Sequence, residues 1–357
     1  MLPFVIAEAG VNHNGDLDKA FALIDLAAEC GADAVKFQTF RAERLATSRA
    51  RTCSYQRTGA AHSESQQDML RRLELDENAF RQLSRHCTDR GIEFMSTAFD
   101  PESLEFLVRE TGLKRIKIPS GEMVNPILLC HAARSGLPMV LSTGLATLDE
   151  VEMALAVLAH GMVTPDGLPT RSEAFDAFRS DAGQAALAAR VTVLHCVSDY
   201  PAPAADCNLR ALRTMRDAFG IPVGFSDHSE GIAVSLAAVA LGATVLEKHY
   251  TLDKSLPGPD HRASLDPGEL RSLIDGIRIV RQSLGDGVKA PRPSEVENRT
   301  AIRGSLVAAT PIAAGTPISL ENVTVKRPGD GLEPMALLEL LGRPARKNYD
   351  VDEQISS

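Results

Sequence analysis

The chain alternates short apolar runs with amphipathic runs eight times over residues 1–285. The apolar runs are nearly continuous, which is typical of parallel strands with both faces buried. The amphipathic runs carry apolar residues at helical spacing, as Leu17, Phe21, Ile24 and Ala28 do within residues 16–30. The expected strands are residues 4–9, 34–40, 94–99, 115–120, 139–144, 191–198, 223–227 and 245–251.

Eight such strand–helix units predict an α/β fold, a TIM (β/α)8 barrel, with a doubly wound open sheet as the second choice. A barrel gathers its chemistry at the carboxyl ends of the strands, whereas an open sheet concentrates it at one switch point. Polar residues do stand near the ends of most of these runs: Glu8, Gln38, Thr97, Ser120, Glu122, Ser142, Ser198, Tyr200, His228 and His249. This distribution favours the barrel.

Two segments interrupt the alternation. Residues 41–75 are expected to be a long polar loop on the site side of the barrel, as a lid or a partner contact. Residues 161–190 precede the sixth strand, at the opposite end, and predict one extra helix. Capping patterns fix two helix starts: Thr147 with Glu150, and Asp266-Pro267 with Glu269.

The barrel domain is expected to end at residue 285. Residues 286–300 are polar and contain prolines, and predict a linker. A small domain over residues 301–357 should follow, with short strands within residues 304–315, 321–329 and 342–351. A domain of this size is marginally stable by itself, so we expect it to pack on a barrel.

Composition excludes several classes of protein. The net charge is −9 and both signs are mixed along the chain, which argues against a nucleic-acid partner. The six cysteines form no CxxC pair, the N-terminus has no basic region typical of a signal peptide, and no apolar run approaches about 20 residues. We therefore expect a reduced, cytoplasmic protein without a membrane contact.

Two histidines close consecutive strands. His228 ends VGFSDHS and His249 ends VLEKHYT. Neighbouring strands lie about 4.8 Å apart, so both imidazoles can bind one divalent metal, such as Mn²⁺, Mg²⁺ or Zn²⁺. Glu247 shares the strand face of His249 and is a candidate ligand or supporting residue. The alternative is an ordinary polar layer of hydrogen-bonded side chains inside the barrel.

Lysines on buried strands indicate an anion. Lys36 and Lys117 lie within expected strands, and an uncompensated buried charge is costly. Lys36 could instead pair with Glu8 on the neighbouring strand. Ser120-Gly121 and Ser142-Thr143-Gly144 add hydroxyls and accessible backbone at successive strand ends, which favours a phosphate site. Together with Arg327, these groups predict a phosphorylated or carboxylated substrate.

Two further motifs stay open at this point. The NHNG of residues 12–15 is either a turn or a functional segment. The polar loop at residues 258–265 contains Asp260, which is either a substrate contact, a base or part of a structural loop.

The chain resembles the sialic acid synthase family. The resemblance rests on AEAGVNHNGD (7–16), GADAVKFQTF (31–40), KIPSGE (117–122), LSTG (141–144), HC…YPAP (195–203), GFSDHS (224–229), EKHYTLD (247–253) and GPDHRASL (258–265). VKRPGDG (325–331) resembles the C-terminal antifreeze-like (SAF, β-clip) domain of that family. The resemblance implies a transferase that condenses phosphoenolpyruvate, water and open-chain N-acetylmannosamine into a nine-carbon sialic acid and phosphate.

The resemblance also implies roles for single residues. His228 and His249 match the ligands of a divalent metal, usually manganese, with Mg²⁺ or Co²⁺ as alternatives. The phosphoenolpyruvate contacts match Lys36, Thr97, Lys117, Ser120, Ser142 and Ser226, and the acceptor-sugar site matches Glu8, Gln38, Glu122, Tyr200 and Asp260. Glu122 is our candidate for the proton of the attacking water, and Lys36 and Lys117 would offset the substrate charges.

Arg327 matches an arginine that enters the active site of a partner subunit, so we expect a domain-swapped homodimer. Ser198 departs from the asparagine of some relatives, close to both substrates.

Other readings stay open. A legionaminate or pseudaminate synthase would use a 2,4-diacetamido-trideoxyhexose acceptor, and these motifs do not separate it from a neuraminate synthase. A 6-phosphorylated acceptor would need a further basic contact. A non-catalytic carbohydrate-binding or ice-binding protein and a metal-dependent aldolase are alternatives of other classes.

Overall fold

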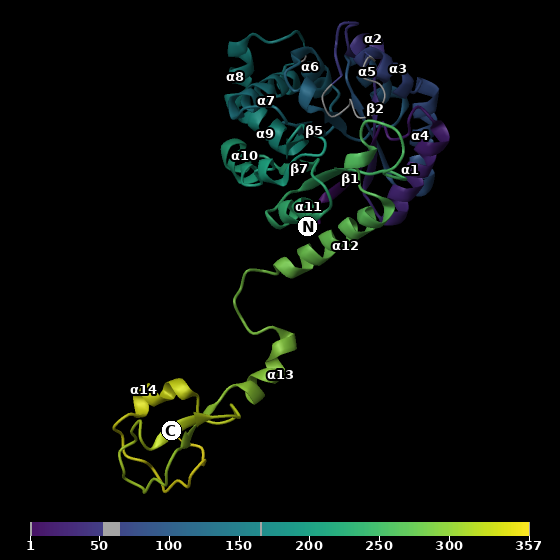
Figure 1. The fold of residues 1–357 in the computed structure, drawn as a ribbon. Helices are drawn as coiled ribbons and strands as arrows, with labels where there is room; N and C mark the ends of the chain where they lie inside the picture. The colour runs from purple at the N-terminus through teal and green to yellow at the C-terminus, as the bar shows by residue number, and fades with distance from the viewer. Residues whose placement is uncertain (1, 53–64, 165, 357) are drawn as a thin grey trace. The chain divides into compact units, whose positions relative to one another are not determined.

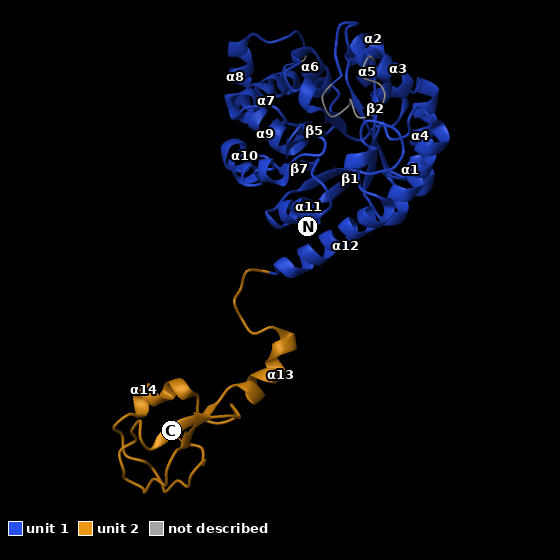
Figure 2. Cartoon of the chain, viewed as in Figure 1, with its two compact units in different colours: residues 1–285 blue, residues 286–357 orange. Residues whose placement is uncertain are grey.

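The computed structural model describes residues 2–52, 65–164 and 166–356. The chain forms two compact units, Met1–Gly285 and Asp286–Ser357, which Figure 2 colours separately. We describe each unit by itself.

Unit 1 is a closed barrel of eight parallel strands in the order β1 to β8. The strands are β1 Phe4–Gly10, β2 Ala34–Thr39, β3 Glu93–Ala98, β4 Ile116–Ile118, β5 Met139–Ser142, β6 Val191–Cys196, β7 Val223–Asp227 and β8 Val245–His249. The pairing of Glu8 with both Lys36 and His249 closes the ring between β2 and β8. The predicted TIM barrel is therefore confirmed, and the open sheet is wrong.

Helices surround the strands (Figure 1). The principal ones are α1 Leu17–Cys30, α4 Glu77–Arg90, α5 Pro101–Glu110, α6 Pro126–Arg134, α7 Leu148–Val163, α10 Ala211–Phe219, α11 Ala233–Ala240 and α12 Pro267–Leu284. Both predicted capping boxes are present: Thr147 and Glu150 begin α7, and Asp266 and Glu269 begin α12. Each box satisfies backbone N–H groups that a helix start otherwise leaves unpaired.

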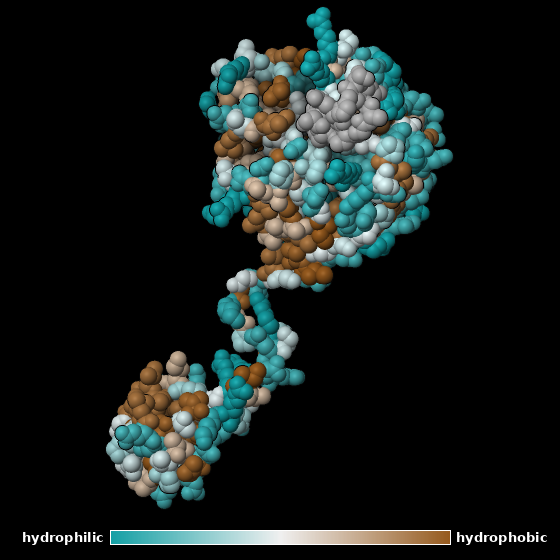
Figure 3. All heavy atoms as spheres, viewed as in Figure 1, coloured by the Kyte–Doolittle hydropathy of each residue, from teal (hydrophilic) through white to brown (hydrophobic). Residues whose placement is uncertain are grey.

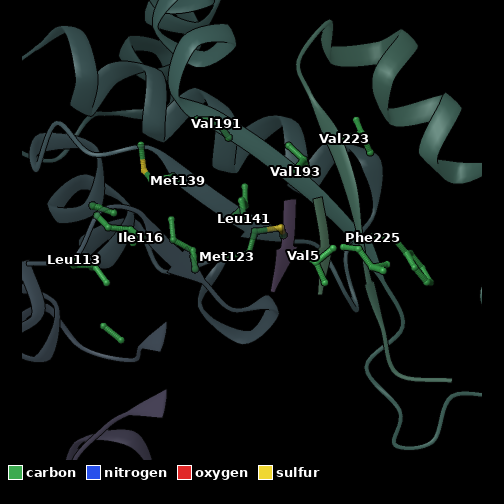
Figure 4. Packing of buried hydrophobic residues seen from close by; sticks show 14 of the residues in the cluster. Val5, Leu113, Ile116, Met123, Met139, Leu141, Val191, Val193, Val223 and Phe225 are labelled. Atoms are coloured by element: carbon green, nitrogen blue, oxygen red, sulfur yellow. The ribbon is translucent and has the colours of Figure 1, made fainter. Parts of the chain in front are cut away.

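The barrel has two apolar layers, because successive strand residues point to opposite faces. Outward-facing residues pack under the helices, and Figure 4 shows several of them, including Leu141, Val193 and Phe225. Inside the barrel a smaller cluster consists of Ile6, Ala34, Met95, Val140, Leu194 and Val245. Each member of the inner cluster lies two residues before another inward-facing position on its strand, and those positions form the floor of the site.

The segment after β2 differs from the predicted loop. It contains α2 Ala42–Leu45 and α3 Gln66–Leu73, while residues 53–64 lie outside the described residues. Ser65 caps α3 by accepting from the backbone N–H of Asp68, at 3.1 Å. Met69, Leu70 and Leu73 are buried against a cluster with Val11 and Phe40. This burial explains the helix: three apolar residues at helical spacing outweigh the polar composition.

The single helix predicted before β6 is wrong, because the chain forms two. α8 Arg171–Arg179 and α9 Asp181–Arg190 are separated at Ser180, whose backbone is extended. The Ser180 hydroxyl accepts from the backbone N–H of Gly183, at 3.0 Å. An N-cap of this kind starts a new helix rather than continuing the old one.

Unit 2 has an antiparallel pair of strands, β9 Ser305–Ala308 and β10 Val323–Lys326. The third predicted strand forms only isolated bridges, Ile312 with Tyr349 and Pro317 with Pro344. The expected linker contains a helix, α13 Pro293–Ile302, which begins at a proline. The remaining helical turn of this unit is α14 Leu337–Leu340, preceded by a short 3₁₀ turn.

A separate core supports unit 2. It consists of Leu306, Ala308, Ile312, Ile318, Val323, Ala345, Tyr349 and Ile355. Large apolar residues also remain exposed, among them Leu320, Met335 and Leu338, and Figure 3 shows apolar surface on this unit. Among the described residues of both units, no helix has the length and apolar character needed to cross a membrane.

Candidate active site

A cavity of about 390 Å³ opens at the carboxyl ends of the barrel strands. This volume is within the usual range for small-molecule sites. The described lining residues are Glu8, Lys36, Gln38, Leu45, Gln66, Leu70, Thr97, Phe99, Lys117, Pro119, Ser120, Gly121, Ser142, Leu145, Ser198, Tyr200, Ser226, His228, Glu247 and His249.

Strand periodicity sets the floor of this cavity. Glu8, Lys36, Thr97, Ser142 and Glu247 each follow a member of the inner apolar cluster by two residues, so they share its inward direction. The barrel therefore carries an apolar plug below and a polar layer above. A polar layer so deeply buried must satisfy its own charges and hydrogen bonds.

Two lysines and two glutamates form the centre of this layer. Lys36 Nζ lies 2.6 Å from Glu8 Oε2 and 3.7 Å from Glu247 Oε2. Lys117 Nζ lies 3.5 Å from Glu247 Oε1. All four side chains are at most 5% exposed. The pairing of Lys36 with Glu8 was the alternative to an anion site, and the structure contains that pair.

The four groups of this layer have shifted pKa values, in different directions. Burial raises the pKa of Glu8 to about 7, although Lys36 opposes the shift. Burial also opposes ionisation of Glu247, but Lys117 and Lys36 outweigh it and lower the pKa of Glu247 to about 2. The pKa of Lys36 is raised, because Glu247 and Glu8 outweigh its burial. Burial lowers the pKa of Lys117, although Glu247 opposes the shift, so Lys36 is the lysine whose positive charge the layer stabilises.

Hydroxyl groups surround the lysines. Lys36 Nζ donates to Thr97 Oγ1 at 3.0 Å, and Lys117 Nζ donates to Ser142 Oγ at 2.7 Å. Both hydroxyls accept from a lysine, so their own protons can be donated to an oxyanion in the cavity. Ser226 instead donates to Glu247 Oε1 at 2.9 Å.

The turn after β4 brings Ser120 into the same wall. Ser120 Oγ accepts from the backbone N–H of Gly144 at 2.9 Å and lies 3.3 Å from Cys196 Sγ. A side chain at Gly144 would meet Ser198 Oγ at 2.2 Å and Ser120 Oγ at 2.9 Å. Glycine therefore lets the loops after β4, β5 and β6 meet without displacing either hydroxyl.

The two histidines lie together, as predicted. Their ring centroids are 5.6 Å apart, and the Tyr200 ring lies 4.1 Å from His228 and 5.5 Å from His249. His228 Nδ1 lies 2.6 Å from the carbonyl oxygen of Val197, which can only accept, so this nitrogen carries the proton and donates. Nε2 of His228 is then left with its lone pair.

Both imidazoles are neutral at physiological pH. Burial lowers the pKa of His228 to about 4 and lowers that of His249 well below its usual value. His249 Nδ1 is buried and has no hydrogen-bond partner in the part of the chain that the structure describes. Neutral imidazoles with an unused nitrogen fit a divalent cation, because such ligands bind through the lone pair.

The number of protein ligands available to such a cation is small. Among residues 2–52, 65–164 and 166–356, no group of three or more histidine, cysteine, aspartate and glutamate residues is arranged to hold a metal. A cation on His228 and His249 would therefore complete its coordination with water or substrate oxygens. An open coordination position is typical of catalytic rather than structural metal sites.

Two predicted site residues of the barrel unit, Glu122 and Asp260, do not line the cavity, and a third belongs to the other unit. Glu122 lies in a short 3₁₀ turn after β4, and its Oε2 accepts from Asn125 Nδ2 at 2.7 Å. Asp260 is buried in the loop after β8, and burial raises its pKa to about 6. Arg327 belongs to unit 2 and is exposed, with no ion pair or hydrogen bond among the described residues. The roles of these three residues stay predictions.

Other lining residues escaped the sequence analysis. Glu247 was considered a candidate metal ligand or supporting residue on the strand face of His249, but it was not counted among the predicted site residues. Leu45, Gln66 and Leu70 come from α2 and α3, so the segment after β2 forms part of the wall. Phe99, Pro119 and Leu145 follow strand ends, and only their position after a strand could have indicated them.

Comparisons with known proteins agree with this geometry. The NeuB family model matches residues 23–289, and the SAF domain model matches residues 303–356. The chain is 45% identical to the N,N'-diacetyllegionaminic acid synthase of Campylobacter jejuni, covering 98% of each chain. It is 43% identical to the protein of the same name from Legionella pneumophila, over 96% of this chain and 90% of that one.

A solved structure is also similar. It is the N-acetylneuraminic acid (sialic acid) synthetase of Leptospira borgpetersenii, with 34% identity and a TM-score of 0.67. The match covers 84% of this chain and 90% of the other.

Proposed function

Because the chain belongs to the NeuB family and carries a SAF domain, we propose that it is a phosphoenolpyruvate-dependent nonulosonate synthase with a 2,4-diacetamido-2,4,6-trideoxymannose acceptor. The product would be N,N'-diacetyllegionaminic acid, with phosphate released. The observation that carries the reaction class is the cavity itself, in which Lys36, Lys117 and the pair His228 and His249 meet.

The charges of the cavity suit this substrate. A phosphate ester carries about −1.5 to −2 charges near pH 7, and phosphoenolpyruvate adds a carboxylate. Lys36 and Lys117 both lie within 4 Å of the ionised Glu247, and the pKa of Glu8 near 7 leaves that carboxyl partly neutral. Hydroxyl protons of Thr97 and Ser142 can then point at phosphate oxygens, because each hydroxyl accepts from a lysine.

His228 and His249 would hold the divalent metal, with manganese as our first choice. When bound, such an ion supplies Lewis-acid polarisation of a carbonyl oxygen and orients water. Carbon 3 of phosphoenolpyruvate would attack the aldehyde carbon of the acceptor, and water would add to carbon 2 before phosphate leaves. Lys36 and Lys117 would neutralise charge on the departing phosphate and the carboxylate. Glu122 stays our candidate for the proton of the attacking water.

The acceptor assignment rests on similarity. The relatives at 45% and 43% identity are both named for diacetyllegionaminic acid, whereas the neuraminic acid synthetase structure is 34% identical. Of the acceptors that the motifs left open, the trideoxy sugar is therefore favoured over N-acetylmannosamine, which is the second candidate.

Acceptor competition tests this assignment. Phosphate release from phosphoenolpyruvate would be measured with each sugar, using metal-stripped protein supplied with Mn²⁺. We expect kcat/KM to be at least tenfold higher with 2,4-diacetamido-2,4,6-trideoxymannose. A preference for N-acetylmannosamine would make this a neuraminate synthase, and no release with either sugar would overturn the enzyme class as well.

A further inference from the structure

Another buried ion pair lies near the carboxyl ends of β7 and β8, on the strand face that points away from the cavity. Lys248 Nζ is 3.1 Å from Asp227 Oδ2, and the two side chains are 1% and 0% exposed. Lys248 stands between the inward-facing Glu247 and His249 on β8, and Asp227 stands between Ser226 and His228. Because side chains alternate along a strand, the ion pair faces the surrounding helices instead of the substrate cavity. The two residues are direct cross-strand neighbours.

Both members of this pair bind the residue that follows His228. Asp227 Oδ1 accepts from the backbone N–H of Ser229 at 2.8 Å and from its hydroxyl at 2.6 Å. Lys248 Nζ donates to the carbonyl oxygen of Ser229. Asp227 Oδ2 also accepts from the Ser235 hydroxyl of α11 at 2.5 Å. The chain directly after His228 is thereby tied to β8, one residue before His249.

His228 is held from its other side by the loop after β6. Its Nδ1 donates to the carbonyl oxygen of Val197 at 2.6 Å, and its own carbonyl oxygen accepts from the N–H of Ala202 at 2.9 Å. These bonds fix the orientation of the imidazole against β6. They leave its separation from His249 to the contacts that join β7 to β8, which near the strand ends include the ion pair and the hydrogen bond from Ser226 to Glu247.

Stability alone is a weak reason for such a pair. Removing two charges from water is expensive, and well-packed apolar residues of similar volume often stabilise a protein as much. This pair makes directed bonds to the backbone beside one metal-ligand candidate and adjoins the other. We propose that Asp227 and Lys248 are positioning residues, which set the distance and orientation of His228 and His249 for one divalent cation. This inference rests on the proposed function, which assigns the cation to that histidine pair.

Metal affinity of the unloaded protein tests the proposal. The full chain would be stripped of metal, and the dissociation constant of Mn²⁺ would be read from the electron paramagnetic resonance signal of the free ion. The main variant is Asp227→Asn combined with Lys248→Met, which removes both charges together and avoids an unpaired buried one. Supporting residues around metal ligands typically change affinity about 10- to 100-fold. We therefore expect the dissociation constant to rise at least about tenfold, with a melting temperature within several degrees of the wild type.

A matched control separates positioning from stability. Glu93 begins β3 and Arg115 directly precedes β4, so this ion pair lies at the strand ends that are away from the cavity. Arg115 Nε is 2.6 Å from Glu93 Oε1. Glu93→Gln combined with Arg115→Met should change the melting temperature without changing the dissociation constant of Mn²⁺. If the main variant does not fold, the dissociation constant of Mn²⁺ would be measured with Ser229→Ala instead. This variant removes only the hydroxyl contact with Asp227. A raised dissociation constant in that variant supports the proposal, and an unchanged one overturns it.

His228→Ala distinguishes the possible failures. If wild type and His228→Ala bind Mn²⁺ equally, the metal assignment and the positioning role are both wrong. If wild type binds more tightly than His228→Ala while the folded main variant matches wild type, only the positioning role is overturned.

Discussion

Buried titratable side chains in this protein take their charge state from their nearest neighbours. Glu247 lies beside two lysines and stays ionised, whereas Glu8 shares one lysine with it, and its pKa rises to about 7. His13 has no such partner: it is 1% exposed, its Nδ1 accepts from the N–H of Gly15 at 3.0 Å, and its Nε2 has no hydrogen-bond partner among the described residues. Burial lowers the pKa of His13 to about 4.

This shift predicts a pH-dependent contribution of His13 to stability. The folded protein binds fewer protons at His13 than the unfolded chain between pH 4 and 6.5, so stability increases with pH across that window. His13→Asn keeps an acceptor for Gly15 and does not titrate. We expect wild type to lose roughly 3 kcal/mol relative to His13→Asn as pH falls from 6.5 to 4.

Urea unfolding of both proteins at several pH values measures this difference. The difference between the two free energies of unfolding should be constant above pH 7. Parallel curves from pH 4 to 7 would show that His13 titrates normally in the folded protein.

At the scale of elements, the site depends on how the loops at the strand ends fit together. The loops after β4, β5 and β6 meet around Gly144, where any side chain would contact Ser198 and Ser120. Similarly, α3 reaches the cavity wall through Leu70 because its apolar face is buried against the start of the β2–α2 connection.

Gly144→Ala should therefore weaken phosphoenolpyruvate binding. The added methyl group must displace the Ser198 or Ser120 hydroxyl, and Ser120 faces the proposed phosphate position. We expect the KM for phosphoenolpyruvate to rise about tenfold or more, since a lost charge-assisted hydrogen bond is worth about 1.5–3 kcal/mol. Steady-state phosphate release measures the change.

Gly268→Ala is the matched control for this prediction. Gly268 lies in the first turn of α12, outside the residues that line the cavity, and its added methyl group makes one ordinary contact at 3.4 Å with Asp266. Its KM should equal that of the wild type. An equal change in both variants would mean that Gly144 has no special place in the site.

Periodicity explains which elements were predictable. Near-continuous apolar runs and capping boxes indicated the eight strands and the starts of α7 and α12, because those signals are local. The break at Ser180 and the burial of Met69, Leu70 and Leu73 depend on tertiary contacts, which composition does not reveal. The same limit applies to the site. Alternation indicated Lys36 and His249, but it did not indicate that Glu122 turns toward Asn125.

At the scale of the whole molecule, two units have separate cores, and the described cavity belongs to the barrel unit. From the sequence resemblance we propose that Arg327 of the other unit contributes to the active site of a partner subunit. Arg327 is exposed, which leaves its guanidinium available for such a contact.

Subunit mixing tests whether sites are shared. Arg327→Ala and His228→Ala should each lose most activity. Heterodimers formed by subunit exchange would contain one site with both residues intact. We therefore expect mixing to restore a substantial fraction of the activity, measured as phosphate release. A mixture of two His228→Ala preparations is the control, and no recovery despite demonstrated exchange would contradict sharing.

The central claim is that one cavity binds phosphoenolpyruvate beside a cation held by His228 and His249. The most direct measurement is phosphate release by metal-stripped wild type and His228→Ala, with and without acceptor, as Mn²⁺ is added. The account predicts phosphate release from the wild type only when acceptor and Mn²⁺ are both present. In His228→Ala the rate of release should fall at least about a thousandfold, which corresponds to a loss of roughly 4 kcal/mol of transition-state stabilisation. Equal release from both proteins, or release at a rate that does not depend on Mn²⁺, would contradict the account.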